Sequence, residues 1–109
     1  MIIEHLSLLA NFGQRPQLAS ALASTVGPIQ VQPGCLSCRL FQSLENPDEF
    51  LLAARWATSD GLISHLQSDT YKRLLLLMEL SPSPPVIEFY TVLETHGLDL
   101  VQEARECRG

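Results

Sequence analysis

The sequence predicts an α+β domain in which an antiparallel sheet of four strands carries helices on one face. Three observations favour this class. Short β-type runs alternate with segments of helical periodicity, turn-forming residues separate the two kinds, and 109 residues are enough for one small core. We therefore expect a single domain over residues 1–109.

Composition and charge narrow the class of protein. The chain is 46% hydrophobic and 17% charged, with a formal net charge of −5 and no basic stripe that could follow a phosphate backbone. We therefore expect no nucleic-acid partner. No apolar stretch approaches the roughly 20 residues of a membrane span, and no basic leader precedes a cleavage site. These features predict a cytoplasmic protein with no membrane partner.

The first half of the chain predicts a strand, a helix and a hairpin. Residues 2–10 form a β-type run that stops before Gly13. A helix is expected from Arg15, with a proline in its first turn, to Gly27-Pro28. Strands are expected over residues 35–44 and 49–57, and the asparagine and proline between them favour a turn.

The second half predicts a helix, a strand and a short terminal helix. Ser59 or Asp60 suits the N-cap of a helix that runs to the proline-rich segment 81–85. A fourth strand is expected over residues 86–94 and a last helix over about 98–106. The order of strand, helix, strand, strand, helix and strand is that of a ferredoxin-like sheet.

Both faces of this sheet are expected to be apolar. Phe50, Leu52 and Trp56 share one face of their strand, and Leu51 and Ala53 share the other. Two helices can cover only one face, so the other face is expected to pack against a second copy of the chain. The sequence therefore predicts a homodimer, in the form of an α/β barrel.

Cysteine and histidine patterns do not favour a metal site. The chain has three cysteines, of which Cys35 and Cys38 form a C-x-x-C pair. On a regular strand these two would point to opposite faces and could not share an ion. His5, His65 and His96 come from separate elements with no ligand spacing. We expect structural cysteines and no metal.

A candidate site lies where the third strand meets the second long helix. Trp56, the only tryptophan, ends that strand, and His65 follows nine residues later on the helix. A strand-to-helix step can fold these two side chains against each other. Simple packing of Trp56 on His65 is an equally favoured interpretation of the pair.

The chain resembles the antibiotic biosynthesis monooxygenase (ABM) family, which forms dimeric α/β barrels. The resemblance extends over nearly the whole chain and rests on Pro33-Gly34-Cys35, Asn46-Pro47, the strand that ends in Trp56, and His65 followed by Ser68 and Tyr71. It implies a small monooxygenase that acts on a quinol or polyketide-like aromatic without a cofactor. His65 would be the base that forms a phenolate, and Trp56 would stack on the ring. The expected apolar pocket, between sheet and helices, is lined by Leu52, Leu62, Leu66, Tyr71 and Tyr90.

Two alternatives to this function stay open. The chain is alternatively a non-catalytic dimer that binds a hydrophobic or aromatic small molecule, since a fold does not fix chemistry. Haem degradation is less favoured, because the family's haem-degrading members pair the tryptophan and histidine with an asparagine on the first strand. Here the middle of that strand carries His5, Leu6 and Ser7. Arg39 and Arg55 are expected to bind an anionic substrate or to pair with Glu88 across the dimer.

Overall fold

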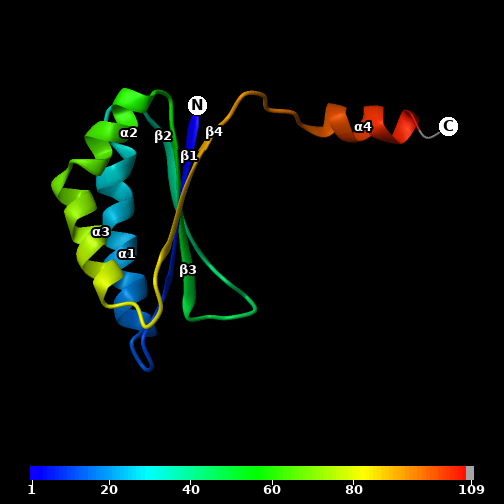
Figure 1. The fold of residues 1–109 in the computed structure, drawn as a ribbon. Helices are drawn as coiled ribbons and strands as arrows, with labels where there is room; N and C mark the ends of the chain where they lie inside the picture. Colours follow the sequence, from blue (N-terminus) through cyan, green and yellow to red (C-terminus); the bar gives the residue numbers. More distant parts are fainter. Residues whose placement is uncertain (108–109) are drawn as a thin grey trace.

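The computed structural model describes residues 1–107 and contains a sheet with helices on one side (Figure 1). Three helices form a layer on the left of the sheet in this view, and a fourth helix stands apart on the right. The elements in chain order are β1 (Ile2–Leu9), α1 (Arg15–Gln30), β2 (Cys35–Gln42), β3 (Glu49–Trp56), α2 (Ser59–Leu66), α3 (Asp69–Glu79), β4 (Val86–Thr91) and α4 (Leu98–Glu106).

The four strands pair in the order β2-β3-β1-β4, and every pair is antiparallel. Strand β1 lies between β3 and β4, with Leu6 opposite both Leu52 and Ile87. The predicted α+β class and the ferredoxin-like sheet are confirmed.

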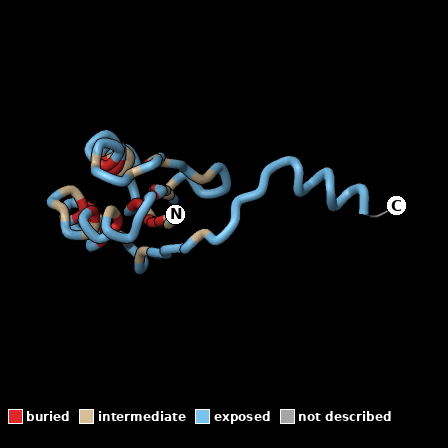
Figure 2. Tube along the Cα trace, turned by 90° about the horizontal axis from the view of Figure 1, so that it is seen from above, coloured by how far each residue is buried: buried red, intermediate tan, exposed pale blue. Residues whose placement is uncertain are grey.

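The core lies between the sheet and the layer of α1, α2 and α3. Buried positions alternate along β1 and β3, and the red segments of Figure 2 gather where these strands face the helices. Helix α1 contributes Leu22 and Ile29, and α3 contributes Leu74. This layer fixes the surroundings of every side chain that points from the sheet toward the helices.

The second long helix of the sequence is divided into α2 and α3, which corrects the prediction of one continuous helix. Oγ of Ser68 accepts a hydrogen bond from the backbone N–H of Tyr71, so Ser68 caps the start of α3. The start of α2 is capped by Thr58 and not by Ser59 or Asp60, because the Thr58 side chain accepts from the N–H of Gly61. Each half therefore begins on its own N-cap.

Helix α1 continues through Gly27 and Pro28 to Gln30, so the predicted stop at these two residues is wrong. A proline inside a helix removes one hydrogen bond and crowds the carbonyl group four residues before it, which costs stability. Burial of Ile29 against the core offsets that cost. The extra turn carries the chain to Gln32, whose side chain reaches the candidate site.

The strands end sooner than predicted. β1 ends at Leu9, β2 at Gln42, β3 at Trp56 and β4 at Thr91. The N–H of Val92 makes a last bond to the carbonyl of Met1, which is where the edge of the sheet stops. Beyond Val92 the chain extends away from the sheet and its layer of helices.

A β-bulge at the start of β2 corrects the expected orientation of the two cysteines. Cys35 lies opposite Trp56 and Cys38 opposite Ala54, because Leu36 is the extra residue of the bulge. Trp56 and Ala54 share one face of β3, so both cysteines face the helical layer. Cys38 is buried and Cys35 is partly buried.

Helix α4 stands away from the rest of the molecule. It is exposed along its whole length in Figure 2, and both views place it at the end of an extended segment. The radius of gyration of 16.5 Å exceeds the roughly 13 Å of a compact chain of this length. Within the described part of the chain, no helix has the length and apolarity needed to cross a membrane.

Candidate functional site

Trp56 and His65 stack on each other inside the core. The ring centroids lie 4.5 Å apart and the ring planes differ by 25°. Trp56 is the last residue of β3 and His65 lies in the last turn of α2, so the short connection between them folds the helix back onto the strand. Both side chains are shielded from solvent, with exposed fractions of 0% and 1%. The predicted proximity of the two residues agrees with this geometry.

Glu4 of β1 joins the pair as a third buried polar residue. The indole Nε1–H of Trp56 donates to Oε1 of Glu4 at 3.0 Å. Nε2 of His65 lies 3.1 Å from Oε1 and 3.3 Å from Oε2 of the same carboxyl group. Glu4 is 1% exposed, so these contacts replace water for the buried carboxyl group.

The amide of Gln32 fixes the ring hydrogen of His65. Oγ of Ser68 donates to the carbonyl oxygen of His65 at 2.7 Å, so its lone pair is free to accept from Nε2 of Gln32 at 3.4 Å. The carbonyl end of the amide then faces the imidazole, with Oε1 of Gln32 at 2.8 Å from Nδ1 of His65. An amide oxygen only accepts, so we assign the hydrogen to Nδ1.

This assignment requires one more proton between His65 and Glu4. With a hydrogen on Nδ1, a neutral imidazole presents a lone pair at Nε2, and an ionised carboxylate presents only lone pairs in return. Two acceptors at 3.1 Å need a hydrogen between them, so either the ring or the carboxyl group carries it. The pair therefore holds one exchangeable proton out of contact with water.

Most of the residues predicted to line the site gather around the pair. Tyr71 meets His65 edge-on, with ring centroids 5.2 Å apart. Leu52 and Leu62 are buried in the same core, and Leu66 is partly buried against it. These aliphatic and aromatic side chains keep the surroundings of the polar group apolar.

Tyr90 does not belong to this group, which corrects its placement in the predicted pocket. It lies opposite Ile3 in the β1–β4 pairing and therefore on the sheet face away from the helices. Its hydroxyl donates to Glu88 at 2.6 Å, and its ring meets His5 edge-on at 5.4 Å. A one-residue shift along β4 separates the two faces, and the apolar run around Tyr90 did not distinguish them.

Sequence reasoning missed Glu4 and Gln32. A signal for Glu4 existed, since Ile2, Glu4, Leu6 and Leu8 alternate with the other face of the strand and place a carboxylate in an apolar row. No such signal exists for Gln32, which lies in the connection after α1. Its contact with His65 depends on the extra turn of that helix.

Burial changes the acid–base properties of the neighbouring side chains. Burial, and then the charge of Glu4, raises the pKa of Tyr71. Burial, followed by the nearby Cys35 and Glu4, raises the pKa of Cys38 to about 12. The pKa of Cys35 is raised as well, mainly by burial. These tyrosine and cysteine side chains therefore stay protonated at neutral pH.

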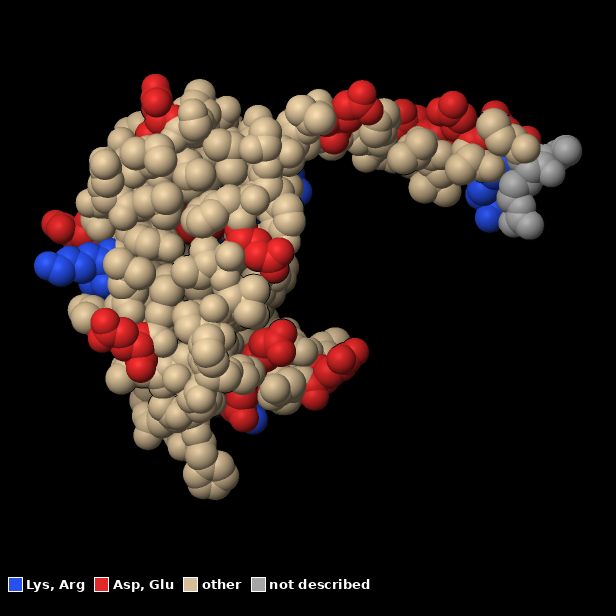
Figure 3. All heavy atoms as spheres, viewed as in Figure 1, with Lys and Arg blue, Asp and Glu red and all other residues tan. Residues whose placement is uncertain are grey.

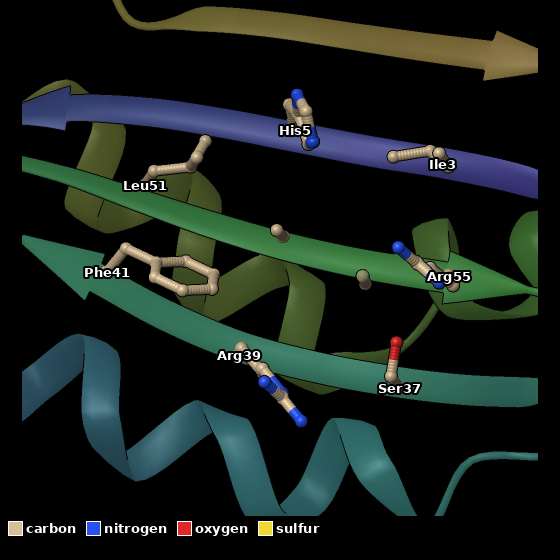
Figure 4. Close-up of a pocket in the computed structure, with 9 residues that line it drawn as sticks. Ile3, His5, Ser37, Arg39, Phe41, Leu51 and Arg55 are labelled. Atoms are coloured by element: carbon tan, nitrogen blue, oxygen red, sulfur yellow. The ribbon is translucent and has the colours of Figure 1, made fainter. Parts of the chain in front are cut away.

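The sheet face away from the helices carries a shallow cavity of about 440 Å³ (Figure 4). Arg39 of β2, Arg55 of β3 and His5 of β1 project from it toward the viewer, between Phe41, Leu51 and Ile3. Neither arginine makes a salt bridge to an acidic group within residues 1–107. We call this surface the open face.

A second hollow of about 390 Å³ lies between α1 and α3, beside the end of β1. Leu18, Leu77 and Leu80 line it together with Asn11 and Gln14. The lining includes neither Trp56 nor His65.

Metal ligands do not cluster in the described part of the chain. Among residues 1–107, no group of three or more His, Cys, Asp or Glu side chains is arranged to hold an ion. His5 faces the open side of the sheet, His65 faces the helices, and His96 lies beyond β4 beside Glu94.

Sequence comparison assigns the chain to a family of α+β proteins. Residues 1–75, well over half of the chain, match the model of the antibiotic biosynthesis monooxygenase (ABM) family. The chain belongs to this family, as the resemblance of its motifs predicts. No curated protein matches the sequence.

Solved structures with the same fold come from several bacteria. A Deinococcus radiodurans protein named for the same family is 22% identical with a TM-score of 0.81, over 89% of this chain and 97% of that one. A Mycobacterium tuberculosis protein is 21% identical with a TM-score of 0.79, over 88% and 98%. A Nitrosomonas europaea protein named for the family is 16% identical with a TM-score of 0.77, over 86% and 100%. At these identities the likeness shows the fold.

Proposed function

We propose that the chain is one subunit of a dimeric monooxygenase that oxidises a phenolic aromatic, a quinol or a polyketide-like phenol, without a metal or a flavin. The observation that supports this most is the buried group of Glu4, His65 and Trp56, joined at 3.0 and 3.1 Å. It combines an exchangeable proton, a flat aromatic surface and an apolar lining. Membership of the ABM family supports the same class of reaction.

In this reaction His65 removes the proton of the phenol. A phenol becomes able to reduce oxygen when it loses its proton, and imidazole is a suitable base near neutral pH. The pair first releases its shared proton to water when the site opens, so that Nε2 of His65 can accept the proton of the phenol. Ionised Glu4 then stabilises the imidazolium that results, in the manner of a carboxylate that supports a catalytic histidine. A phenol and O₂ then give a quinone and water, because the substrate supplies both electrons for the second oxygen atom. The balance needs no external reductant.

Trp56 has a positioning role in this proposal. Its indole offers an apolar surface against which a flat ring can stack, and its N–H holds Glu4 in place at 3.0 Å. Both Trp56 and His65 are fully buried in the free chain, so substrate contact requires α2 to move away from the sheet. Helix α2 has only eight residues and is the shortest helix of the layer, so its displacement from the sheet breaks the fewest contacts.

The homodimer is part of the proposal. The open face exposes Phe41, Tyr90 and Val86 along the sheet, and large apolar side chains at the surface favour burial against another protein. A second copy packed there would form the predicted barrel. Arg39 and Arg55 would then pair with Glu88 of the second copy or hold an anionic substrate.

A non-catalytic binding protein is the second candidate, and one observation favours it. The rings of Trp56 and His65 are stacked on each other, with centroids 4.5 Å apart. Two aromatic side chains that only stabilise a core adopt the same arrangement. Haem degradation is less favoured, because β1 carries no asparagine that could join Trp56 and His65.

Oxygen uptake by the purified full chain tests the proposed function. A panel of hydroquinones and polycyclic phenols is offered to the wild type and to the variants Trp56→Phe, His65→Ala and Glu4→Gln. Uptake that depends on substrate and falls at least tenfold in His65→Ala and Glu4→Gln supports the oxygenase. Tyr90→Phe, on the other face of the sheet, is the matched control and is expected to keep its activity. Absence of uptake with every substrate, or uptake indifferent to His65 and Glu4, supports the binding protein instead.

A further inference from the structure

Helix α4 and the segment before it form an arm that packs against no other part of residues 1–107. We call residues 93–107 the arm. Its large apolar side chains are exposed, with Leu93 at 93%, Leu98 at 68% and Val101 at 52%. A helix of nine residues is marginal in water on its own, so α4 needs a surface to lie on.

The arm helix has two distinct sides. At 100° per residue, one half of its circumference carries the apolar residues and the other carries acidic ones. The apolar side comprises Leu98, Leu100, Val101 and Ala104, with Arg105 between Val101 and Leu98, and the polar side comprises Asp99, Gln102, Glu103 and Glu106. A half-apolar helix is typical of one that lies on the surface of a protein. The acidic polar side disfavours a membrane, because interfacial helices carry lysine and arginine there.

The direction of the arm indicates which molecule its apolar side contacts. In both views the arm leaves the sheet on the side away from α1, α2 and α3, which is the side of the open face (Figures 1 and 2). The connection between β2 and β3 projects on the same side in Figure 1, so the arm and this connection overhang the open face from its two ends. A protein seated on the open face would lie directly within reach of α4.

Charge also favours a second copy of this chain. Acidic atoms line the arm in the space-filling view (Figure 3). The sequence of the arm contains four acidic residues, Glu94, Asp99, Glu103 and Glu106, and one basic residue, Arg105. The open face carries Arg39 and Arg55, which make no salt bridge within residues 1–107, and one acidic residue of β4, Glu88, which accepts from Tyr90. An acidic arm and a basic face on one molecule become complementary when two copies meet about a two-fold axis.

We propose that the two subunits exchange their arms, so that α4 of each packs its apolar side on the other subunit. This rests on the homodimer proposed above and adds to it which segment holds the partner.

The test compares two double variants of the full chain by sedimentation equilibrium. Leu98→Asp with Val101→Asp disrupts the apolar side of α4, and Asp99→Asn with Glu103→Gln changes only the polar side. The exchange predicts that the first variant raises the dissociation constant of the dimer at least tenfold. The second is expected to change it by less than the first. An unchanged dissociation constant in Leu98→Asp with Val101→Asp overturns the proposal.

Hydrogen exchange of the arm distinguishes a failure of the arm-exchange proposal from a failure of the dimer proposal. The proposal predicts that the amides of residues 98–106 are protected in the dimer and lose that protection on dilution to monomers. A stable dimer with an unprotected arm overturns the exchange and leaves the dimer in place. Protection that is independent of concentration shows that the arm lies on its own subunit and overturns the exchange. A wild-type chain that is monomeric at all concentrations overturns both.

Discussion

Nε2 of His65 lies 3.1 Å from Oε1 of Glu4, and neither side chain has contact with solvent. A histidine and a carboxylate in this relationship share a proton that water cannot reach. Every other hydrogen bond of the group is accounted for by Trp56, Gln32 and Ser68. The pair is therefore the most chemically specific feature inside the core.

Glu4→Gln is expected to keep the fold and remove the exchangeable proton. The amide oxygen can still accept from Trp56, and the amide N–H₂ can donate to the lone pair at Nε2 of His65. We expect the free energy of unfolding to change by less than about 1 kcal/mol at pH 8. Urea titration followed by tryptophan fluorescence measures it.

Glu4→Ala is the contrasting variant at the same position. It leaves the indole N–H of Trp56 and Nε2 of His65 without buried partners and opens a cavity, so we expect a loss of about 3–5 kcal/mol. Equal losses in Glu4→Gln and Glu4→Ala would contradict the assigned hydrogen positions.

The pH dependence of stability is expected to report Tyr71. Burial and the charge of Glu4 raise its pKa above the ordinary 10.0 in the folded state only. Above pH 10 the unfolded chain releases the phenolic proton while the folded chain keeps it, so the free energy of unfolding falls as the pH rises. Tyr71→Phe removes this contribution.

Urea titrations at pH 9 and pH 10.5 measure the effect. The wild type is expected to lose more stability between the two values than Tyr71→Phe does. Tyr90, whose pKa is also raised, through its hydrogen bond to Glu88, is present in both chains and cancels in the comparison. An identical pH dependence in the two chains would argue against the burial of Tyr71.

The three cysteines are expected to react with a thiol reagent in a fixed order. Cys107 is exposed and reacts first, Cys35 is partly buried and follows, and Cys38, with a pKa of about 12, reacts only on unfolding. Timed labelling at pH 8 with mass spectrometry gives the order. Cys107→Ser is the control that removes the fast phase, and rapid labelling of native Cys38 would be inconsistent with its place in the core.

Gly27→Ala is expected to stabilise the protein. Gly27 lies in α1 with open space where a Cβ would stand, so alanine improves helix propensity by about 0.5–1 kcal/mol without a clash. Gly61→Ala in α2 is the matched control and is expected to destabilise, because its Cβ would lie 3.0 Å from the carbonyl oxygen of Pro33. Thermal unfolding of both variants tests the contrast, and a gain in Gly61→Ala would show that the loop before β2 can yield.

Strong local signals predicted the fold. Period-two runs in β1 and β3, the turn between β2 and β3, and the prolines after α3 are short-range features, and each fixes an element within a few residues. The break between α2 and α3 was not predicted, because Ser68 caps α3 only when its side chain accepts a hydrogen bond from the N–H of Tyr71. The continuation of α1 past Pro28 was not predicted, because burial of Ile29 outweighs the low helix propensity of Gly27 and Pro28.

The candidate site was predictable in part. Trp56 and His65 are close in sequence, so their proximity follows from one strand-to-helix step. Glu4 and Gln32 approach them from other elements, and no local pattern carries that information. The bulge at Leu36, which turns Cys35 toward the helices, likewise depends on pairing with β3.

The contact between Glu4 and His65 also sets an order of events during synthesis. The two residues are 61 positions apart, and Glu4 leaves the ribosome long before its partner is made. Until α2 exists, a carboxylate in the middle of β1 opposes entry of that strand into any apolar core. We therefore expect β1 to settle into the core only once α2 has been synthesised and His65 is available to Glu4.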